Sequence, residues 1–175
     1  MGGEIGVDSR PGEGSTFWFT VRLAKVAHLI KTEPLQDPRP AEETLVLSYS
    51  GARILLAEDE PFNQEVTRIL IEEAGLRVDV ADDGAKAVEM AKETDYDLIL
   101  MDLRMPVLDG VDATRQIRSL PGRSKTPILA LTASVFTKDS EACFAAGMND
   151  FIGKPVNPDS FFATLLEWLE KADRE

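Results

Sequence analysis

The strongest constraint on the fold is a series of short apolar runs that alternate with longer amphipathic stretches from Ala52 onward. In the run Leu98-Ile99-Leu100-Met101 every position is apolar. A strand of a parallel sheet has this composition when helices cover both faces of the sheet. Apolar runs that alternate with amphipathic stretches are typical of repeated βα units. We therefore expect an α/β fold with a parallel sheet in this part of the chain.

The alternation predicts five strands and five helices. The apolar residues Phe62, Val66, Ile69 and Leu70 follow the spacing of one helix face. Right-handed crossovers between such units give a doubly wound sheet. The strands are expected near residues 53–58, 77–81, 96–102, 127–132 and 149–153. The helices are expected near residues 61–75, 84–94, 110–120, 137–146 and 158–171, the last with Asn157 as its cap and Pro158 at its first position.

The N-terminal part follows a different pattern. Between residues 4 and 23, alternating apolar residues on either side of a glycine-rich turn predict a β-hairpin. Two strands alone are marginally stable in water, so the hairpin is expected to be the edge of a larger unit. Residues 25–51 contain three prolines among mixed charges and are predicted to be a linker. Within them, Leu45-Val46-Leu47 is either a short strand or a loose contact.

Composition excludes several classes of protein. The 175 residues allow one core, and 19 basic against 31 acidic residues give a net charge of −12. Binding to nucleic acid or to an anionic membrane needs a basic surface, so neither is expected. The single cysteine, Cys143, permits no internal disulfide. No apolar stretch approaches the ~18 residues of a membrane span, and the N-terminus does not resemble a signal peptide. We expect a cytoplasmic protein.

Acidic residues follow two of the expected strands. Glu58 and Asp59 end the first apolar run, and Asp102 ends the third. The carboxyl ends of parallel strands meet at one edge of the sheet, where ligands bind. Two carboxylates ~4 Å apart repel by about 4 kcal/mol at an effective dielectric constant of ~20. This cluster therefore predicts a bound cation, and Mg2+ suits carboxylates because it binds oxygen and retains waters that a phosphate can replace.

Four motifs identify a family. The stretches ILLAEDEPFNQ, DLILMDLRMPVLDG, PILALTAS and AGMNDFIGKPV resemble the receiver domain of two-component response regulators, over about residues 52–171. Each motif falls at the end of an expected strand. The resemblance implies a flavodoxin-like, five-stranded parallel sheet in the order 2-1-3-4-5.

The resemblance also implies roles for the acids. Asp102 matches the phosphoacceptor, whose carboxylate oxygen attacks the phosphorus of a phosphohistidine to form an acyl phosphate. Asp59 matches the direct Mg2+ ligand, and Glu58 matches a neighbour that acts through a bound water. The backbone carbonyl of Arg104 matches the position that completes the protein shell of the metal. The Arg104 side chain could touch the phosphoryl group or lie in solvent.

Three further residues match the family's pattern. Thr132 matches the hydroxyl that donates to a phosphoryl oxygen. Lys154 matches the cation that stabilises charge during transfer, and its bond to Pro155 is often cis in the family. Phe151 matches the switch aromatic that turns inward after phosphorylation, although a phenylalanine in a strand also suits a core. Asn63 matches a region that docks phosphotransfer helices.

Residues 1–23 carry a second resemblance, to the final strands of the ATP-binding domain of sensor histidine kinases. The family's ATP-binding boxes lie upstream of these strands, and Met1 matches an internal position of the pattern. We therefore expect a histidine-kinase remnant at residues 1–24, a linker at 25–51 and a receiver domain at 52–175. The parent is expected to be a hybrid histidine kinase, which could itself be anchored in a membrane. This segment is not expected to phosphorylate itself from ATP.

The expected function is phosphorelay signalling. A phosphohistidine in the parent or a partner would donate to Asp102, and a histidine phosphotransfer domain would receive the group. Any catalysis of its own would be limited to Mg2+-dependent self-phosphorylation and self-dephosphorylation.

Other functions remain as alternatives. An aspartyl-nucleophile phosphohydrolase usually carries a second acid two residues after the nucleophile, where this chain has Arg104. A dinucleotide-binding domain is disfavoured because no G-x-G-x-x-G follows the first strand. A docking-only receiver is disfavoured because the acids, the threonine and the lysine are all present.

Three other side chains have structural interpretations. Cys143 is expected to be a small buried residue. Trp168 widens the apolar face of the last helix, either as rim packing or as a docking or dimer contact. Gly110 is expected to serve in a turn.

Overall fold

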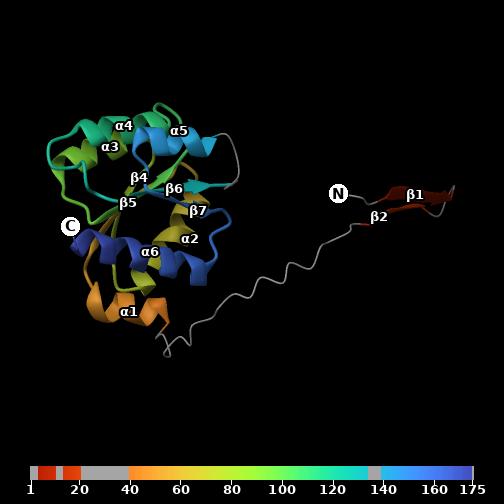
Figure 1. The fold of residues 1–175 in the computed structure, drawn as a ribbon, viewed down its shortest axis with the longest axis horizontal. Coiled ribbons are helices and arrows are strands. Elements are labelled where there is room, and N and C mark those ends of the chain that lie inside the picture. Colours follow the sequence, from red (N-terminus) through yellow and green to blue (C-terminus); the bar gives the residue numbers. More distant parts are fainter. Residues whose placement is uncertain (1–3, 11–13, 21–39, 134–138, 175) are drawn as a thin grey trace. The chain divides into compact units, whose positions relative to one another are not determined.

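A computed structural model describes residues 4–10, 14–20, 40–133 and 139–174. The chain forms two units, residues 1–36 and 37–175, and each is described by itself (Figure 1). The hairpin turn at 11–13, the predicted linker from 25 to 39, and the first two residues of the helix expected at 137–146 lie outside the described residues.

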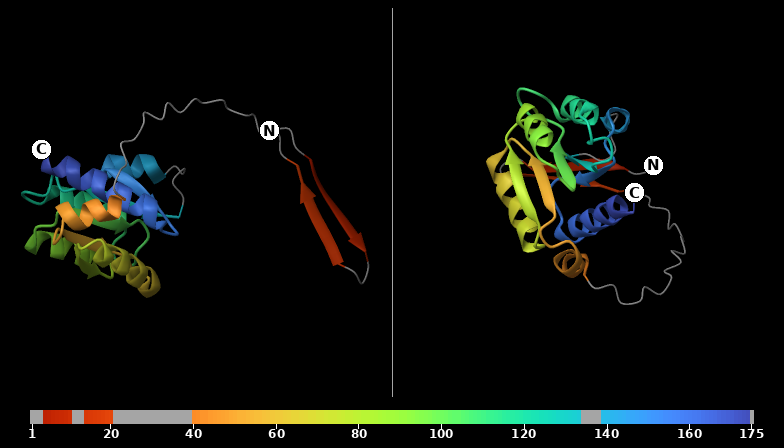
Figure 2. Two further views of the ribbon diagram at one scale, coloured as in Figure 1. Left: turned by 90° about the horizontal axis from the view of Figure 1, so that it is seen from below. Right: turned by 90° about the vertical axis from the view of Figure 1, so that its left-hand side faces the viewer.

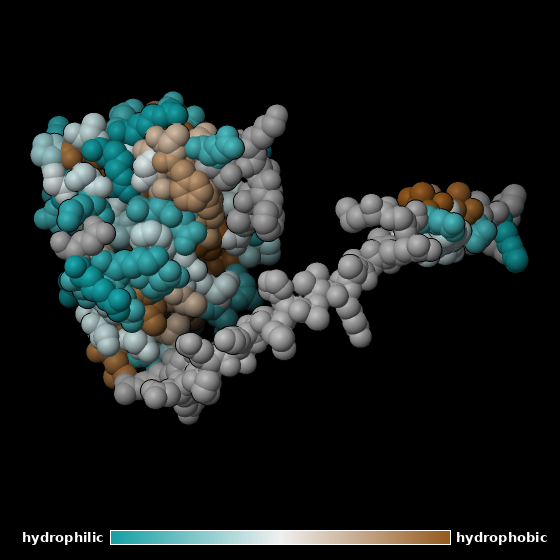
Figure 3. Space-filling model, in the orientation of Figure 1, coloured by the Kyte–Doolittle hydropathy of each residue, from teal (hydrophilic) through white to brown (hydrophobic). Residues whose placement is uncertain are grey.

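The first unit contains the predicted hairpin. Strand β1 (Ile5–Arg10) pairs antiparallel with β2 (Gly14–Phe19). Ile5 lies opposite Phe19 and Val7 opposite Phe17, so these four side chains share one face. Their exposed fractions range from 53% for Val7 to 83% for Ile5, and Figure 3 shows apolar residues gathered along one side of the hairpin. The hairpin thus presents an apolar face that the described residues of its own unit leave exposed.

The second unit is built on a parallel sheet. Its strands are β3 (Arg53–Ala57), β4 (Arg77–Ala81), β5 (Leu98–Asp102), β6 (Ile128–Thr132) and β7 (Asp150–Gly153). They lie in the order β4-β3-β5-β6-β7, and all neighbours are parallel. Numbered within the sheet, this is the flavodoxin-like order 2-1-3-4-5, so the predicted fold is confirmed.

Helices connect the strands. They are α2 (Pro61–Glu73), α3 (Gly84–Glu93), α4 (Gly110–Ser119), α5 (Asp139–Ala146) and α6 (Pro158–Asp173), each within two residues of its predicted ends. The side chain of Asn157 accepts a hydrogen bond from Ser160 N (3.2 Å), so the predicted cap of α6 is confirmed. Among the described residues, no helix is both long and apolar enough to span a bilayer.

The two faces of the sheet carry separate cores. Ile54 and Leu56 of β3 pack on the side of α1 (Ala41–Ser48), α2 and α6, whereas Leu55 and Ala57 pack on the side of α3, α4 and α5. Figures 1 and 2 show this division into two helix layers. All five residues of β5 are buried, because β5 is the central strand and helices cover both of its faces. This arrangement accounts for the continuous apolar run from Leu98 to Met101.

Helix α1 corrects the prediction for residues 25–51. The segment Leu45–Leu47 was expected to be a strand or a loose contact within a linker, but it belongs to a helix. Leu45 is fully buried in the core shared with α6. Glu42 and Glu43 lie in the first turn of α1, where they complement the helix dipole. Helix α1 therefore packs as part of the second unit, and the domain boundary expected at 52 stays a prediction.

The structure also settles the two packing assignments. Cys143 is fully buried among the residues under α3, α4 and α5, as predicted. Trp168 packs at the edge of the other core, and its Nε1 donates a hydrogen bond to Asp150 Oδ2 (3.0 Å). Lys171 Nζ lies 4.1 Å from the centre of the Trp168 ring. Trp168 therefore packs at the rim of this core, and its role as a docking or dimer contact stays a prediction.

We predict that Leu45→Ala destabilises the protein by about 2–5 kcal/mol, because the substitution leaves a cavity in a packed core. Leu47→Ala on the same helix is the matched control, since Leu47 is 66% exposed and its loss is expected to cost no more than about 0.5 kcal/mol. Urea unfolding measures both values. Equal stability of the two variants would show that α1 is not part of the folded core.

Candidate functional site

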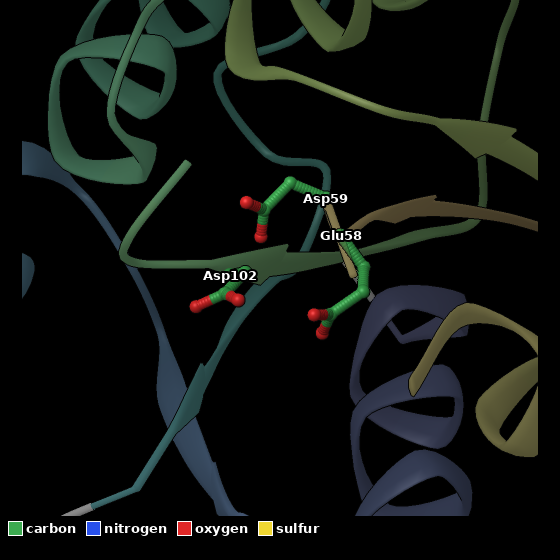
Figure 4. Close-up of side chains that lie close together, drawn as sticks. All are labelled: Glu58, Asp59 and Asp102. Atoms are coloured by element: carbon green, nitrogen blue, oxygen red, sulfur yellow. The ribbon is translucent and has the colours of Figure 1, made fainter. Parts of the chain in front are cut away.

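Three carboxylates converge at the carboxyl edge of the sheet. Glu58 and Asp59 follow β3, and Asp102 ends β5. Because Ala57 pairs with Met101 in neighbouring parallel strands, the residues that come next meet at the same edge. One oxygen from each acid lies within 4.8 Å of the others, and Figure 4 shows Glu58 and Asp59 turned toward Asp102. The sequence-based prediction of an acidic cluster is confirmed in its geometry.

The ammonium of Lys154 contacts two of the three carboxylates. Its Nζ lies 2.6 Å from Asp102 Oδ2 and 2.5 Å from Glu58 Oε2. The lysine directly follows β7, and its backbone N donates to Thr132 O (2.7 Å) at the end of β6. The Lys154–Pro155 bond is cis, as the resemblance implied. The structure therefore brings Lys154 and Thr132 to the same edge as the acids.

Glu58 is fully buried, and its two carboxylate oxygens differ in their surroundings. Oε1 accepts a hydrogen bond from Asn63 Nδ2 (3.1 Å). Oε2 is close to the Lys154 ammonium, but among the described residues it accepts no well-directed hydrogen bond. A buried carboxylate oxygen normally has a partner, so this atom has unused capacity for a cation or a bound water.

The charges in the cluster influence one another. Burial is the main effect on Glu58 and raises its pKa, while the nearby Lys154 ammonium and the hydrogen bond from Asn63 oppose this in part. For Lys154, burial by itself lowers the pKa, but the hydrogen bond to Asp102 and the ion pair with Glu58 outweigh it and raise the pKa overall. The ammonium therefore stays protonated at neutral pH. Three carboxylates facing one ammonium leave an excess of negative charge that a divalent cation fits.

A cavity of about 250 Å3 opens beside Asp102, which is 9% exposed. Asp102, Arg104, Thr132 and Lys154 are among its lining residues. The backbone N of Arg104 donates to Asp102 Oδ1 (3.1 Å), which fixes the carboxylate plane. The side chain that the family pattern assigns to phosphoryl transfer thus faces a space that a small group can enter.

Phe151 lies in β7, next to β6. It is half-buried, and its ring packs edge-on against Phe144 of α5 with 5.0 Å between ring centres. Phe144 is 54% exposed, so the pair lies at the surface of the α5 side. Phe151 is therefore well placed for the switch role, which stays a prediction.

Gly110 has a closer relation to the site than its predicted role in a turn suggests. A Cβ at this position would lie 2.0 Å from the carbonyl oxygen of Asp102. Thr114 Oγ1 donates to the Gly110 carbonyl (2.7 Å). This hydrogen bond helps to fix the first turn of α4 where it passes close to Asp102. Only glycine allows the chain to return this closely over Asp102, and the sequence signal was the glycine eight residues after it.

Asn63 and Gln64 also contact the site, which the sequence analysis did not foresee. Asn63 holds the Glu58 carboxylate, and Gln64 Nε2 donates to the Glu58 carbonyl (2.6 Å). The signal that could have revealed them is the adjacent pair of amide side chains in the first turn after the acids.

Comparison with known proteins identifies the family. Residues 54–166 match the family model of the response regulator receiver domain. The receiver domain of the sensor histidine kinase PA1611 from Pseudomonas aeruginosa, crystallised with a magnesium ion in its active-site cleft, is 44% identical. The match covers 69% of this chain and 98% of that domain, with a TM-score of 0.66. The chain belongs to the response regulator receiver family.

Longer relatives are sensor kinases. The sensor histidine kinase AruS of P. aeruginosa is 38% identical over 169 residues, and the aerobic respiration control sensor protein ArcB of Escherichia coli is 35% identical over 176. These alignments cover 95% and 100% of this chain but only 16% and 22% of the relatives. The chain is thus similar to a receiver-containing segment of hybrid sensor kinases.

A further structure contains a relay partner. The receiver domain of Ssk1 from Saccharomyces cerevisiae, crystallised with the histidine phosphotransfer protein Ypd1, is 31% identical. That match covers 68% of this chain and 89% of the other, with a TM-score of 0.63.

We predict that Lys154→Met lowers the free energy of unfolding by about 3 kcal/mol without divalent cations, because it leaves partly buried carboxylates unpaired. Lys86→Met is the matched control, since Lys86 of α3 pairs with Asp82, which precedes the helix, and both side chains are exposed. That pair is expected to contribute less than about 1 kcal/mol. Urea unfolding in the presence of a chelator compares the variants. If both lost the same stability, Lys154 would not be the counter-ion of the cluster.

Proposed function

We propose that this chain is the phosphoryl acceptor of a phosphorelay, with Asp102 as the residue that is phosphorylated. The observation that carries the proposal is the position of the Asp102 carboxylate. It lies 2.6 Å from the Lys154 ammonium, within reach of two further acids, and at the wall of an open cavity. An acid with these neighbours can act as a nucleophile toward a phosphoryl group whose charge is shared by the surrounding cations.

The proposed cofactor is Mg2+. Asp59, Asp102 and the Arg104 carbonyl would hold it, and Glu58 would act through a bound water. The spacing of the acids and the unused capacity of Glu58 Oε2 fit a hard divalent cation. The magnesium in the PA1611 receiver domain supports the assignment. When bound, Mg2+ neutralises negative charge on the acids and the incoming phosphoryl oxygens.

In the proposed transfer, an oxygen of Asp102 forms a bond to phosphorus while the bond from phosphorus to the donor histidine nitrogen breaks. The electron pair of the broken bond returns to the imidazole. Lys154 pairs with a phosphoryl oxygen, and the Thr132 hydroxyl donates a hydrogen bond to another. These groups stabilise the charge that the planar phosphoryl group carries during transfer.

Phosphorylation adds close to two negative charges and three acceptor oxygens to Asp102. We infer that Thr132 then moves toward the phosphoryl group and that Phe151 turns inward. Because the Phe151 ring packs on Phe144, this movement would alter the face formed by α5, β7 and α6. Phosphorylation would thereby shift an existing equilibrium of that face.

The parent is proposed to be a hybrid histidine kinase. Residues 1–24 would be the last strands of its ATP-binding domain, because the AruS and ArcB alignments extend across nearly the whole chain. The hairpin has an exposed apolar face that includes Ile5 and Phe17. Such a face is expected of strands that form the edge of a larger unit. The receiver would work on the cytoplasmic side, and the net charge of −12 argues against nucleic acid as a partner.

The donor would be a phosphohistidine of the parent or a partner, and the recipient a histidine phosphotransfer domain. The complex of Ypd1 with the Ssk1 receiver supports this class of partner. Phe62, Val66 and Ile69 form an exposed apolar strip on α2. This strip lies beside the loop that carries Lys154, so a docked helix could bring its histidine to Asp102.

Incubation with acetyl phosphate and Mg2+, followed by intact mass measurement, tests the acceptor. The wild type is expected to gain one phosphoryl group, and Asp102→Asn none, because the amide cannot form the acyl phosphate. Asp82→Asn is the control, since Asp82 is another acid directly after a strand at the same edge. Equal labelling of wild type and Asp102→Asn, or turnover of a generic phosphate ester that survives Asp102→Asn, would contradict the proposal.

The switch is tested by nuclear magnetic resonance with beryllofluoride as a phosphoryl mimic. Amides of Phe144 and Phe151 and the indole of Trp168 are expected to shift, because they belong to α5, β7 and α6. Amides of α1 are the internal control and are expected to move little. A spectrum in which the α5-β7-α6 face does not change would refute the switch.

A further inference from the structure

Two neighbouring amide side chains at the start of α2 hold the same acidic residue. Asn63 Nδ2 donates to Glu58 Oε1 (3.1 Å), and Gln64 Nε2 donates to the Glu58 backbone carbonyl (2.6 Å). One contact therefore fixes the side chain of Glu58, and the other fixes its main chain. The roles proposed above for the acids, Thr132 and Lys154 do not use either amide.

The first turn of α2 directs both amides back toward the end of β3. Glu60 caps the helix, and its Oε2 accepts a hydrogen bond from the backbone N of Asn63 (2.8 Å). The backbone N of Gln64 donates to the Glu60 carbonyl (3.0 Å), and Pro61 occupies the first helical position. Asn63 and Gln64 are half-buried, whereas their neighbour Phe62 is 72% exposed. The amides thus face the site, and the apolar strip faces solvent.

The chemistry of an amide suits this position. Glu58 is fully buried, so each of its oxygens needs a partner. The Asn63 amide satisfies Oε1 without adding charge, and Oε2 is left facing the Lys154 ammonium. A lysine or arginine in place of Asn63 would compete with the cations of the site. An acid there would repel Glu58.

We propose that Asn63 is a positioning residue for the magnesium site, acting through Glu58. It fixes the rotation of the Glu58 carboxylate, so that the oxygen not bonded to Asn63 faces the cluster, and Gln64 assists by fixing the backbone that carries the carboxylate. This inference rests on the proposed function, because it assumes that the cluster binds Mg2+. It assigns to Asn63 an inward role in addition to any contact with a docked partner.

Calorimetric titration of the full chain with Mg2+ tests the proposal. Asn63→Ala is expected to bind Mg2+ about tenfold more weakly than the wild type, the loss typical when a partner that orients a metal ligand is removed. Asn63→Leu keeps the size of the side chain, lacks the donor, and is expected to show a similar loss. Gln116→Ala is the matched control, because Gln116 is an exposed amide on α4 and is expected to bind as the wild type does.

A double-mutant cycle separates a role through Glu58 from a general structural effect. In a Glu58→Gln background, Asn63→Ala is expected to change Mg2+ affinity much less than in the wild type, since the carboxylate that it orients is gone. At saturating Mg2+, Asn63→Ala is expected to regain labelling by acetyl phosphate. Urea midpoints check that all variants are folded.

Three results would overturn the inference: wild-type affinity in both Asn63 variants, an undiminished effect of Asn63→Ala beside Glu58→Gln, or labelling that saturating Mg2+ does not restore. In each of them the proposed function would stand, provided that the wild type binds Mg2+ and is labelled on Asp102. A wild type that bound no Mg2+ would refute both the proposed cofactor and this inference.

Discussion

The repulsion among three carboxylates at one edge of the sheet is the constraint on which the site depends. Parallel strands β3 and β5 deliver Glu58, Asp59 and Asp102 to a shared space, where each close pair costs several kcal/mol at a moderate dielectric constant. Lys154 is the counter-ion that the fold itself supplies. The lysine reaches the acids from the end of β7 because the sheet order sets β6 and β7 beside β5. The order of the strands in the sheet therefore determines which charged side chains meet, and it places the ammonium of Lys154 beside the carboxylates.

Other parts of the structure fix the positions of these charged side chains. Helices cover both faces of the sheet, so the strands that carry the acids are buried and shielded from water. Gly110 lets the chain pass within van der Waals contact of the Asp102 carbonyl, and Asn63 fixes the buried carboxylate of Glu58. The excess negative charge that remains is what makes the site receptive to Mg2+. In the proposed function, a phosphoryl group brings more negative charge to this site, so it would need both the metal and Lys154.

Sequence alone predicted most of the fold, because buried parallel strands and their amphipathic helices leave strong local patterns. The run Leu98–Met101 and the cap at Asn157 are examples, and both are confirmed. Helix α1 was missed because it has eight residues and follows several prolines, and its only fully buried side chain is Leu45. Its helical form depends on packing against α6, which no local pattern reveals. The contacts of Asn63 and Gly110 were missed for the same reason, since they depend on which strands become neighbours.

The proposed phosphorelay depends on Asp102 accepting the phosphoryl group from a phosphohistidine. The most direct measurement incubates the chain with a phosphorylated histidine phosphotransfer protein and Mg2+, then reduces the product with borohydride. Reduction converts an acyl-phosphorylated aspartate to homoserine, which mass spectrometry of peptides can locate. Homoserine is expected at position 102 alone and only when Mg2+ is present. Homoserine at another acidic position, or equal conversion without Mg2+, would contradict it.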